Sequence, residues 1–122
     1  MQQAPTPPQC QTMEGRSLRR VLFTQVAAAV TALGKKGVLP SLHVVLVGEN
    51  KASKIYINAK LEAAKKLGID AVFHHLPATA TQQQLNKLLT TLSDDDAAHA
   101  VLLQLPLPQQ FDKNAALACI AP

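Results

Sequence analysis

The sequence predicts an α/β protein, a single domain built as a three-layer helix–sheet–helix sandwich around a mainly parallel sheet. Its 122 residues suffice for one domain and not for two. Three short apolar runs alternate with segments whose apolar residues recur every three or four positions. Strands separated by helices in this way favour right-handed crossovers, which place neighbouring strands parallel.

The first two predicted elements are a helix and a strand. The helix opens at Ser17 and is closed by Gly34 and Gly37. Its apolar residues at three- and four-residue steps are Leu18, Val21, Leu22, Val26, Ala29, Val30 and Leu33. The strand is Leu42–Val47, a nearly continuous apolar run of the kind that is buried on both faces of a sheet.

A second helix and a second strand follow. The helix is predicted over residues 52–67, with Gly68 as its C-terminal stop, and the strand over Asp70–Leu76. Upstream of all these elements, residues 1–12 are rich in Pro and Gln. They predict a disordered N-terminal tail, so the folded domain is expected over residues 13–122.

The C-terminal part of the chain continues the alternation. Thr81 and Gln84 have the spacing of a capping box, which predicts a third helix through about Leu92. A third strand is predicted at His99–Gln104 and a last short helix at Lys113–Ile120.

Composition and charge disfavour several classes of protein. Hydrophobic residues make up 48% and charged residues 16%, as in ordinary globular domains, and no apolar run approaches the roughly 20 residues of a membrane span. The net charge of +4 comes from cations scattered in pairs, which favours solvated helix faces over a nucleic-acid interface. With no secretory signal, and with Cys10 and Cys119 in no disulfide or metal pattern, we expect a cytoplasmic protein.

Candidate functional residues gather where two strands end. In such sheets ligands bind beyond the carboxyl ends of the strands. On the helix after the first strand, Ser53, Tyr56 and Lys60 stand three and four residues apart and share one side. Gln104 ends the otherwise apolar third strand. A hydroxyl, a phenol, an amine and an amide are therefore expected to face one cleft.

The chemistry of this set centres on Lys60. An ammonium is a poor base, whereas desolvation beside apolar side chains favours a neutral amine, and the uncharged Gln104 would orient that amine without adding charge. Tyr56 would offer a stacking face to a flat heterocycle. Taken alone, the spacing has a simpler interpretation, a half-buried ring beside an exposed lysine, with Ser53 at a helix start and Gln104 satisfying backbone groups.

Other polar residues carry weaker signals. His74 and His75 are adjacent on a strand, so their rings point to opposite faces and cannot chelate one metal ion. His43 and His99 share no ligand spacing with them. Gly48 lacks the glycine partners of a phosphate-binding loop. We therefore predict no metal site and no cofactor site within this chain.

Two motifs together resemble a known family. The first is Leu42-x-Val44-Val45-Leu46-Val47-Gly48-x-Asn50-x-Ala52-Ser53-x-x-Tyr56-x-x-x-Lys60, and the second is Val101-Leu102-Leu103-Gln104-Leu105-Pro106-Leu107-Pro108. With both motifs, the chain resembles the N-terminal, folate-binding catalytic domain of the bifunctional methylenetetrahydrofolate dehydrogenase/methenyltetrahydrofolate cyclohydrolase. The resemblance runs from about Met13 to Pro122.

This resemblance implies an activity and a role for each candidate residue. The family oxidises methylenetetrahydrofolate to methenyltetrahydrofolate with NADP and hydrolyses the product to formyltetrahydrofolate, within one-carbon metabolism and purine biosynthesis. By the resemblance, Lys60 is the catalytic group of the hydrolysis, and Gln104 hydrogen-bonds and tunes it. The substrate-binding residues it implies are Tyr56, which stacks on the folate rings, together with Ser53, Leu105 and Pro106.

The chain departs from the family pattern in two turns and at its end. Ser93-Asp94-Asp95 stands where the family has Asn-x-Asp, and Lys51 stands where proline is common. Ile120-Ala121-Pro122 is similar to the Ile-x-Pro that precedes Lys-Asp-Val-Asp-Gly in the family, whose aspartate holds the pterin. We therefore expect the NADP-binding domain to be absent, apolar surface to be uncovered, and the isolated chain to be weakly active or inactive. The full-length family is expected to form a homodimer.

Three functional interpretations remain distinct. The chain is either a catalytic but incomplete part of this enzyme, or a non-catalytic remnant or binding module with the same fold. A short-chain dehydrogenase, which also carries Tyr-x-x-x-Lys, requires a glycine-rich turn after the first strand, and Gly48-Glu49-Asn50-Lys51 does not supply one. The expected ligands are tetrahydrofolate derivatives, without a nucleic-acid or membrane partner.

Overall fold

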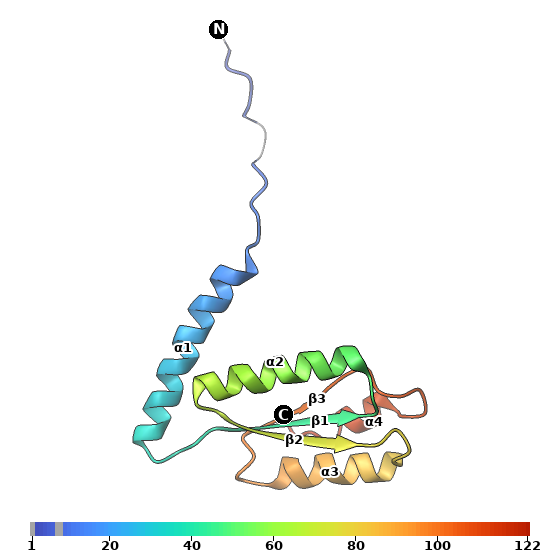
Figure 1. Ribbon diagram of the computed structural model, residues 1–122. Coiled ribbons are helices and arrows are strands. Elements are labelled where there is room, and N and C mark those ends of the chain that lie inside the picture. Colours follow the sequence, from blue (N-terminus) through green and yellow to red (C-terminus); the bar gives the residue numbers. More distant parts are fainter. Residues whose placement is uncertain (1, 7–8) are drawn as a thin grey trace.

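Helices cover both faces of a small central sheet (Figure 1). This computed structural model describes residues 2–6 and 9–122. The helices are α1 (Gly15–Lys35), α2 (Lys51–Leu67), α3 (Gln82–Asp94) and α4 (Lys113–Leu117), and the strands are β1 (Ser41–Val47), β2 (Asp70–Leu76) and β3 (Ala100–Leu103). The predicted α/β sandwich is confirmed.

The sheet is parallel throughout, with the strand order β2-β1-β3. Val45 of the central strand pairs with His74 on one side and with Leu103 on the other. β1 is therefore enclosed by a strand on each edge and by helices on each face. This position accounts for its nearly continuous apolar sequence, as predicted.

The two faces of the sheet bury separate apolar cores, because successive side chains of a strand point to opposite faces. On one face, Val44 and Leu46 pack with Ile57 of α2. On the other face, Val45 and Val47 pack with α3 and α4. The buried members of that second core are Val45, Val47, Ala80, Leu85, Leu89, Leu92, Leu103, Phe111 and Ala116.

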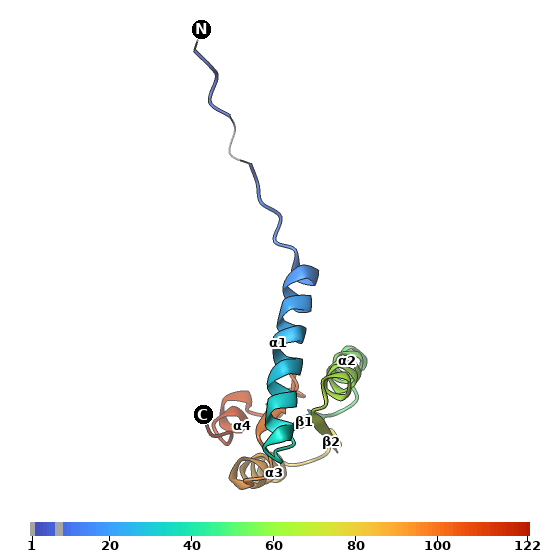
Figure 2. The same cartoon turned by 90° about the vertical axis from the view of Figure 1, so that its left-hand side faces the viewer.

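Helix α1 projects away from this body (Figures 1 and 2). None of its residues is buried. The C-terminal half of α1 lies close to Gly68, the C-cap of α2. A Cβ added at Gly68 would lie 3.3 Å from Cγ1 of Val30 in α1. The exposed large apolar residues of α1 are Leu18, Val21, Leu22, Val26 and Leu33. The expectation of uncovered apolar surface is thus met on α1.

Several predicted boundaries differ from the structure by one or more residues. α1 begins at Gly15 rather than Ser17, and β3 ends at Leu103, one residue before Gln104. The last helix ends at Leu117 and not at Ile120. There the backbone tightens, because the N–H groups of residues 119 and 120 donate to carbonyls three residues back and not four.

The N-terminal segment carries no helix or strand over residues 2–6 and 9–14, and its described residues are exposed. The predicted disordered tail over residues 1–12 includes residues 1, 7 and 8, which lie outside the described part, and disorder of this tail stays a prediction. Within residues 2–6 and 9–122, no helix is both long enough and apolar enough to cross a membrane.

The predicted capping box opens α3. The Thr81 hydroxyl accepts a hydrogen bond from the Gln84 N–H at 3.1 Å, and the Thr81 N–H donates to Gln84 Oε1 at 2.9 Å. Two backbone donors at the helix start are thereby satisfied.

Two histidines from neighbouring strands meet on the α3 side of the sheet. His43 Nδ1 lies 2.9 Å from His74 Nε2, and the rings stack with centroids 5.2 Å apart. Burial lowers the pKa of His74 below its ordinary value of 6.5, and the neighbouring His43 lowers it further. Sequence spacing missed this contact because the two residues lie on different strands.

This pair predicts a loss of stability in acid. The unfolded chain binds a proton at His74 more readily than the folded chain, so the stabilisation is complete above the unfolded pKa and is lost as the pH falls through about 6.5. We expect the urea midpoint to fall more for the wild type than for His74→Gln between about pH 7.5 and pH 5.5. Equal losses in both proteins would show that His74 does not contribute.

Candidate active site

The turn between β1 and α2 positions the first candidate residues. The Asn50 side chain accepts a hydrogen bond from the Ser53 N–H at 2.9 Å, which makes Asn50 the N-cap of α2. Ser53 is the third residue of α2, so it lies in the first turn of the helix, as the simpler interpretation placed it, but it is not the N-cap. The signal in the sequence for this helix start was Asn50, which stands three residues before Ser53 and is of a residue type preferred at the N-cap.

Lys60 and Gln104 meet at the carboxyl edge of the sheet. Lys60 Nζ donates a hydrogen bond to Gln104 Oε1 at 2.7 Å. Lys60 lies about 12 Å along α2 from Ala52, at 1.5 Å per residue, and its long stem spans the remaining gap. The structure thus joins two residues that are 44 positions apart in the sequence.

The backbone around Gln104 sets the direction of its amide. Its N–H donates to the Val45 carbonyl at 2.9 Å, which continues the sheet one residue beyond β3. Its Nε2 donates to the Leu105 carbonyl at 2.9 Å. With Nε2 engaged in this way, Oε1 is turned toward Lys60 as an acceptor. The arrangement can hold an amine in place without adding a charge.

Tyr56 and Ser53 lie in contrasting environments. Tyr56 is 60% exposed, so its ring is open to a flat ligand. Ser53 is 1% exposed, and its Oγ has no hydrogen-bond partner among the described residues. Ser53 therefore faces the interior beneath α2, whereas Tyr56 and Lys60 lie nearer the surface. A place for Ser53 in an open pocket stays a prediction.

Leu105 and Pro106 continue the chain past Gln104 at the same edge. Both residues are exposed, and the peptide bond between them is cis. Pro106 lines a hollow of about 160 Å³ together with the turn after β1. Leu105 and Pro106 thus follow Gln104 in the chain, but the hollow that Pro106 lines includes neither Gln104 nor Lys60.

A charged cluster that sequence spacing missed braces the turn after β1. Glu49 pairs with Lys54, and its other carboxylate oxygen lies 3.2 Å from His75 Nε2. The hydrogen bond from Lys54 is the main cause that lowers the pKa of Glu49. His75 Nε2 also lies 2.8 Å from the Gly48 carbonyl. β2 is thereby tied to the turn from which α2 starts.

Gly48 adopts a left-handed backbone conformation in the turn after β1. Its φ is +86°, and a Cβ placed there would lie 3.4 Å from Pro108 Cγ and 3.7 Å from Ala78 Cβ. Both distances are ordinary van der Waals contacts, and the positive φ is the reason that glycine suits this position. Across the described ranges, no group of three or more His, Cys, Asp or Glu side chains could hold a metal ion.

Comparison with known proteins agrees with this architecture. Residues 13–122 match the family described as tetrahydrofolate dehydrogenase/cyclohydrolase, catalytic domain. The bifunctional protein FolD 2 of Geobacter metallireducens is 39% identical over 110 residues, which cover 90% of this chain and 39% of that protein. The bifunctional protein FolD of Campylobacter concisus is 42% identical over 110 residues, with the same two coverages. The chain thus spans about two fifths of the length of these curated relatives.

Solved structures give the same result. The bifunctional FolD methylenetetrahydrofolate dehydrogenase/cyclohydrolase of Campylobacter jejuni superposes with a TM-score of 0.85 at 36% identity, over 88% of this chain and 38% of that one. The FolD of Trypanosoma brucei, complexed with NADP cofactor and inhibitor, also gives 0.85, at 32% identity, over 94% of this chain and 39% of that one. The chain belongs to the tetrahydrofolate dehydrogenase/cyclohydrolase family and matches its catalytic domain.

Proposed function

We propose that this chain forms the folate site of a methylenetetrahydrofolate dehydrogenase/methenyltetrahydrofolate cyclohydrolase, with Lys60 as the catalytic group of the hydrolysis. The hydrogen bond of 2.7 Å between Lys60 Nζ and Gln104 Oε1 carries this proposal. It holds an amine at the carboxyl edge of a parallel sheet, where ligands of such folds bind.

The hydrolysis requires a base and then an acid at one position. In its neutral form Lys60 takes a proton from the water that attacks the methenyl carbon, which gives a neutral hydroxyl adduct. The adduct then collapses: its hydroxyl proton leaves to solvent, one carbon–nitrogen bond of the bridge breaks, and the freed nitrogen takes the proton from Lys60. Cationic methenyltetrahydrofolate and water thus give formyltetrahydrofolate and one proton.

The neighbouring residues position the two reactants. Gln104 orients the amine through its uncharged Oε1, because a carboxylate there would favour the ammonium form. The exposed ring of Tyr56 stacks on the pterin, and Leu105 and Pro106 border the pocket. The buried Ser53 lines its floor.

The dehydrogenase step uses NADP bound by a part of the enzyme that this chain does not contain. This chain covers 39% of the length of a bifunctional relative, which supports this division. In the complete enzyme the folate held beside Tyr56 would supply the hydride. The complete enzyme acts in the cytoplasm as a homodimer, within one-carbon metabolism and purine biosynthesis, and has no nucleic-acid partner.

Binding of a folate analogue to Tyr56 tests the site directly. Tyr56 is the single tyrosine and the chain has no tryptophan, so intrinsic fluorescence reports this position alone. We expect saturable quenching by 5-formyltetrahydrofolate, and at least about fivefold weaker binding by calorimetry for Tyr56→Ala, since an aromatic pair contributes about 1 kcal/mol beyond its buried area. Tyr56→Phe keeps the stacking face and is the matched control. Equal affinity of all three proteins would contradict the assignment of Tyr56.

A second candidate function, folate binding without turnover, is favoured by the exposure of Tyr56. With 60% of this residue open to water, a ring stacked on it remains solvated on its other face. An open site of this kind binds its ligand but does not exclude water in the way that strengthens charge stabilisation. Saturable binding with no hydrolysis of methenyltetrahydrofolate would support this candidate.

A further inference from the structure

The contact between His43 and His74 brings together two imidazoles from neighbouring strands. His43 lies in β1 opposite Val72, and His74 lies in β2 opposite Val45. His43 Nδ1 is 2.9 Å from His74 Nε2, and the two ring planes are inclined by 18°. Both residues are half-buried, so solvent reaches the pair. The two histidines are 31 positions apart, so sequence spacing gave no sign of a shared site.

The separation of the two nitrogens matches the span of two adjacent ligands around a metal ion. Imidazole nitrogens bind divalent first-row metals at about 2.0–2.1 Å. An ion at that distance from both nitrogens would lie off the line that joins them, with an angle of about 90° between its two bonds. A tetrahedral ion would need the nitrogens about 3.3–3.4 Å apart. The pair therefore favours an ion with square-planar or octahedral geometry, such as Ni²⁺ or Cu²⁺.

The sheet holds the two histidines in place before an ion binds. β1 and β2 pair along their whole length, Ser41–Val47 with Asp70–Leu76, which fixes the positions of both Cα atoms. In the neutral pair, one ring N–H donates to the facing nitrogen of the other ring. When that proton moves to the far nitrogen of its own ring, both facing nitrogens offer lone pairs to an ion. This tautomer change releases no proton.

We propose that His43 and His74 form a binding site for a divalent transition metal ion that favours bond angles near 90°, the class of Ni²⁺ and Cu²⁺. Water fills the remaining coordination positions, because no third His, Cys, Asp or Glu side chain completes a metal-binding group within residues 2–6 and 9–122. The bound ion links β1 to β2 and stabilises the sheet. This inference does not depend on the proposed folate site, because neither histidine belongs to it.

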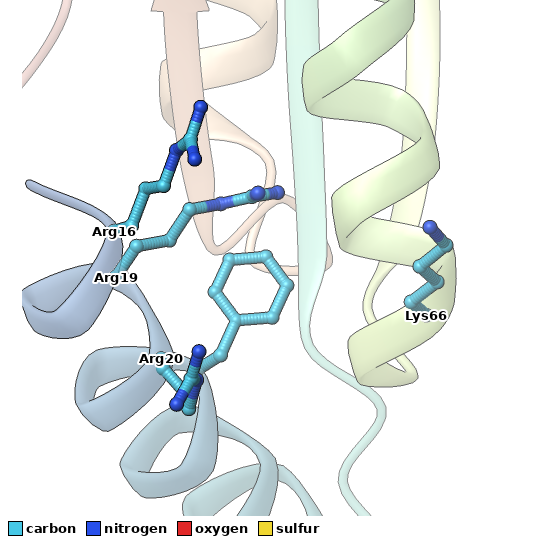
Figure 3. Close-up of a pocket in the computed structure, with 5 residues that line it drawn as sticks. Arg16, Arg19, Arg20 and Lys66 are labelled. Carbon is cyan, nitrogen blue, oxygen red and sulfur yellow. The ribbon is translucent and has the colours of Figure 1, made fainter.

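The hollow between α1 and α2 gives a metal ion no competing site. Figure 3 shows its cationic side chains. The residues that line it are Arg16, Arg19, Arg20, Phe23 and Lys66. Guanidinium and ammonium groups have no lone pair for a metal and repel a cation. The exposed thiol of Cys10 is a metal ligand in its own right, so the test uses a chain with Cys10→Ser.

Calorimetry with Ni²⁺ tests the site in the untagged Cys10→Ser chain. We expect saturable binding of a single ion. His43→Gln and His74→Gln should each weaken it at least about tenfold, since loss of even an outer partner of a metal ligand costs roughly 10–100-fold. The matched control is His75→Gln, which should keep binding within about twofold, because adjacent residues of a strand face opposite sides of the sheet. Zn²⁺ should bind more weakly than Ni²⁺, because the pair is too narrow for a tetrahedral ion.

Two further measurements decide the outcome. Excess Ni²⁺ should raise the urea midpoint of the Cys10→Ser chain and leave that of its His74→Gln variant unchanged, because only the native pair binds the ion. The ring-proton NMR signals of His43 and His74 should shift or broaden before those of His75 and His99, which tests the site even where a variant fails to fold. Equal affinity in all variants, or NMR changes that begin at His75 or His99, would show adventitious binding and overturn the inference. Zn²⁺ binding as tightly as Ni²⁺ would overturn the assigned class of ion.

Discussion

Lys60→Met is expected to lower the rate of methenyltetrahydrofolate hydrolysis by at least about a hundredfold, because a positioned proton-transfer group contributes roughly 10²–10⁴. Methionine keeps the length of the stem and removes the amine. The loss of the methenyl absorbance measures the rate, both in the 122-residue chain and in the chain joined to the C-terminal part of a bifunctional relative. In the joined protein the wild-type rate is expected to be higher, since more of the site is enclosed.

The matched control for this prediction is Lys65→Met. Lys65 is exposed in the last turn of α2, so its replacement removes the same charge and leaves the site intact. We expect hydrolysis by that variant to stay near the wild-type rate. Affinity for 5-formyltetrahydrofolate should change little in Lys60→Met, because the stacking face of Tyr56 is untouched. Undiminished turnover in Lys60→Met would remove Lys60 from the proposed mechanism.

Leu46→Ala is expected to destabilise the fold by about 3 kcal/mol, within the range measured for leucines in well-packed cores. Leu46 is completely buried in the central strand, where it packs with Val44 and Ile57 under α2. Single domains are stable by only roughly 5–15 kcal/mol, so this one change removes a large share of the total. Urea unfolding followed by far-UV circular dichroism measures the shift in free energy.

Leu39→Ala provides the control for the buried leucine. Leu39 lies in the segment before β1 and is 63% exposed, so its loss should cost less than about 0.5 kcal/mol. Equal destabilisation by the two substitutions would show that α2 does not cover this face of the sheet.

The sequence predicted those helices and strands whose signals act within a few residues of the chain. The apolar run of β1 predicted the central strand, and the Thr81–Gln84 spacing predicted the start of α3, because each signal acts within a few residues. The predicted end of α4 at Ile120 was wrong, because the N–H groups after Leu117 donate to carbonyls three residues back and not four. The amino-acid sequence carries no signal for this change of hydrogen bonding.

In the candidate site, too, contacts within one helix were predictable from spacing, whereas contacts between different elements were not. Helical spacing placed Tyr56 and Lys60 on one side of α2, but the contact with Gln104 depends on how β3 lies beside β1. The rule that ligands bind beyond the carboxyl ends of parallel strands predicted that Lys60 and Gln104 face one cleft, and the resemblance to a family implied the hydrogen bond between them. The links from Glu49 to His75 and from His43 to His74 join different elements, so only the folded chain brings them together.

The way α1 stands off the body has a consequence for hydrogen exchange. Its amides are held by the helix's own hydrogen bonds, without buried side chains to keep the helix closed. They are expected to exchange through local opening, while the amides of Val44, Val45 and Leu46 in β1 exchange only when the whole domain unfolds. A molecule that packs against α1 would therefore slow amide exchange in this helix and leave exchange in β1 unchanged, so β1 serves as the internal reference.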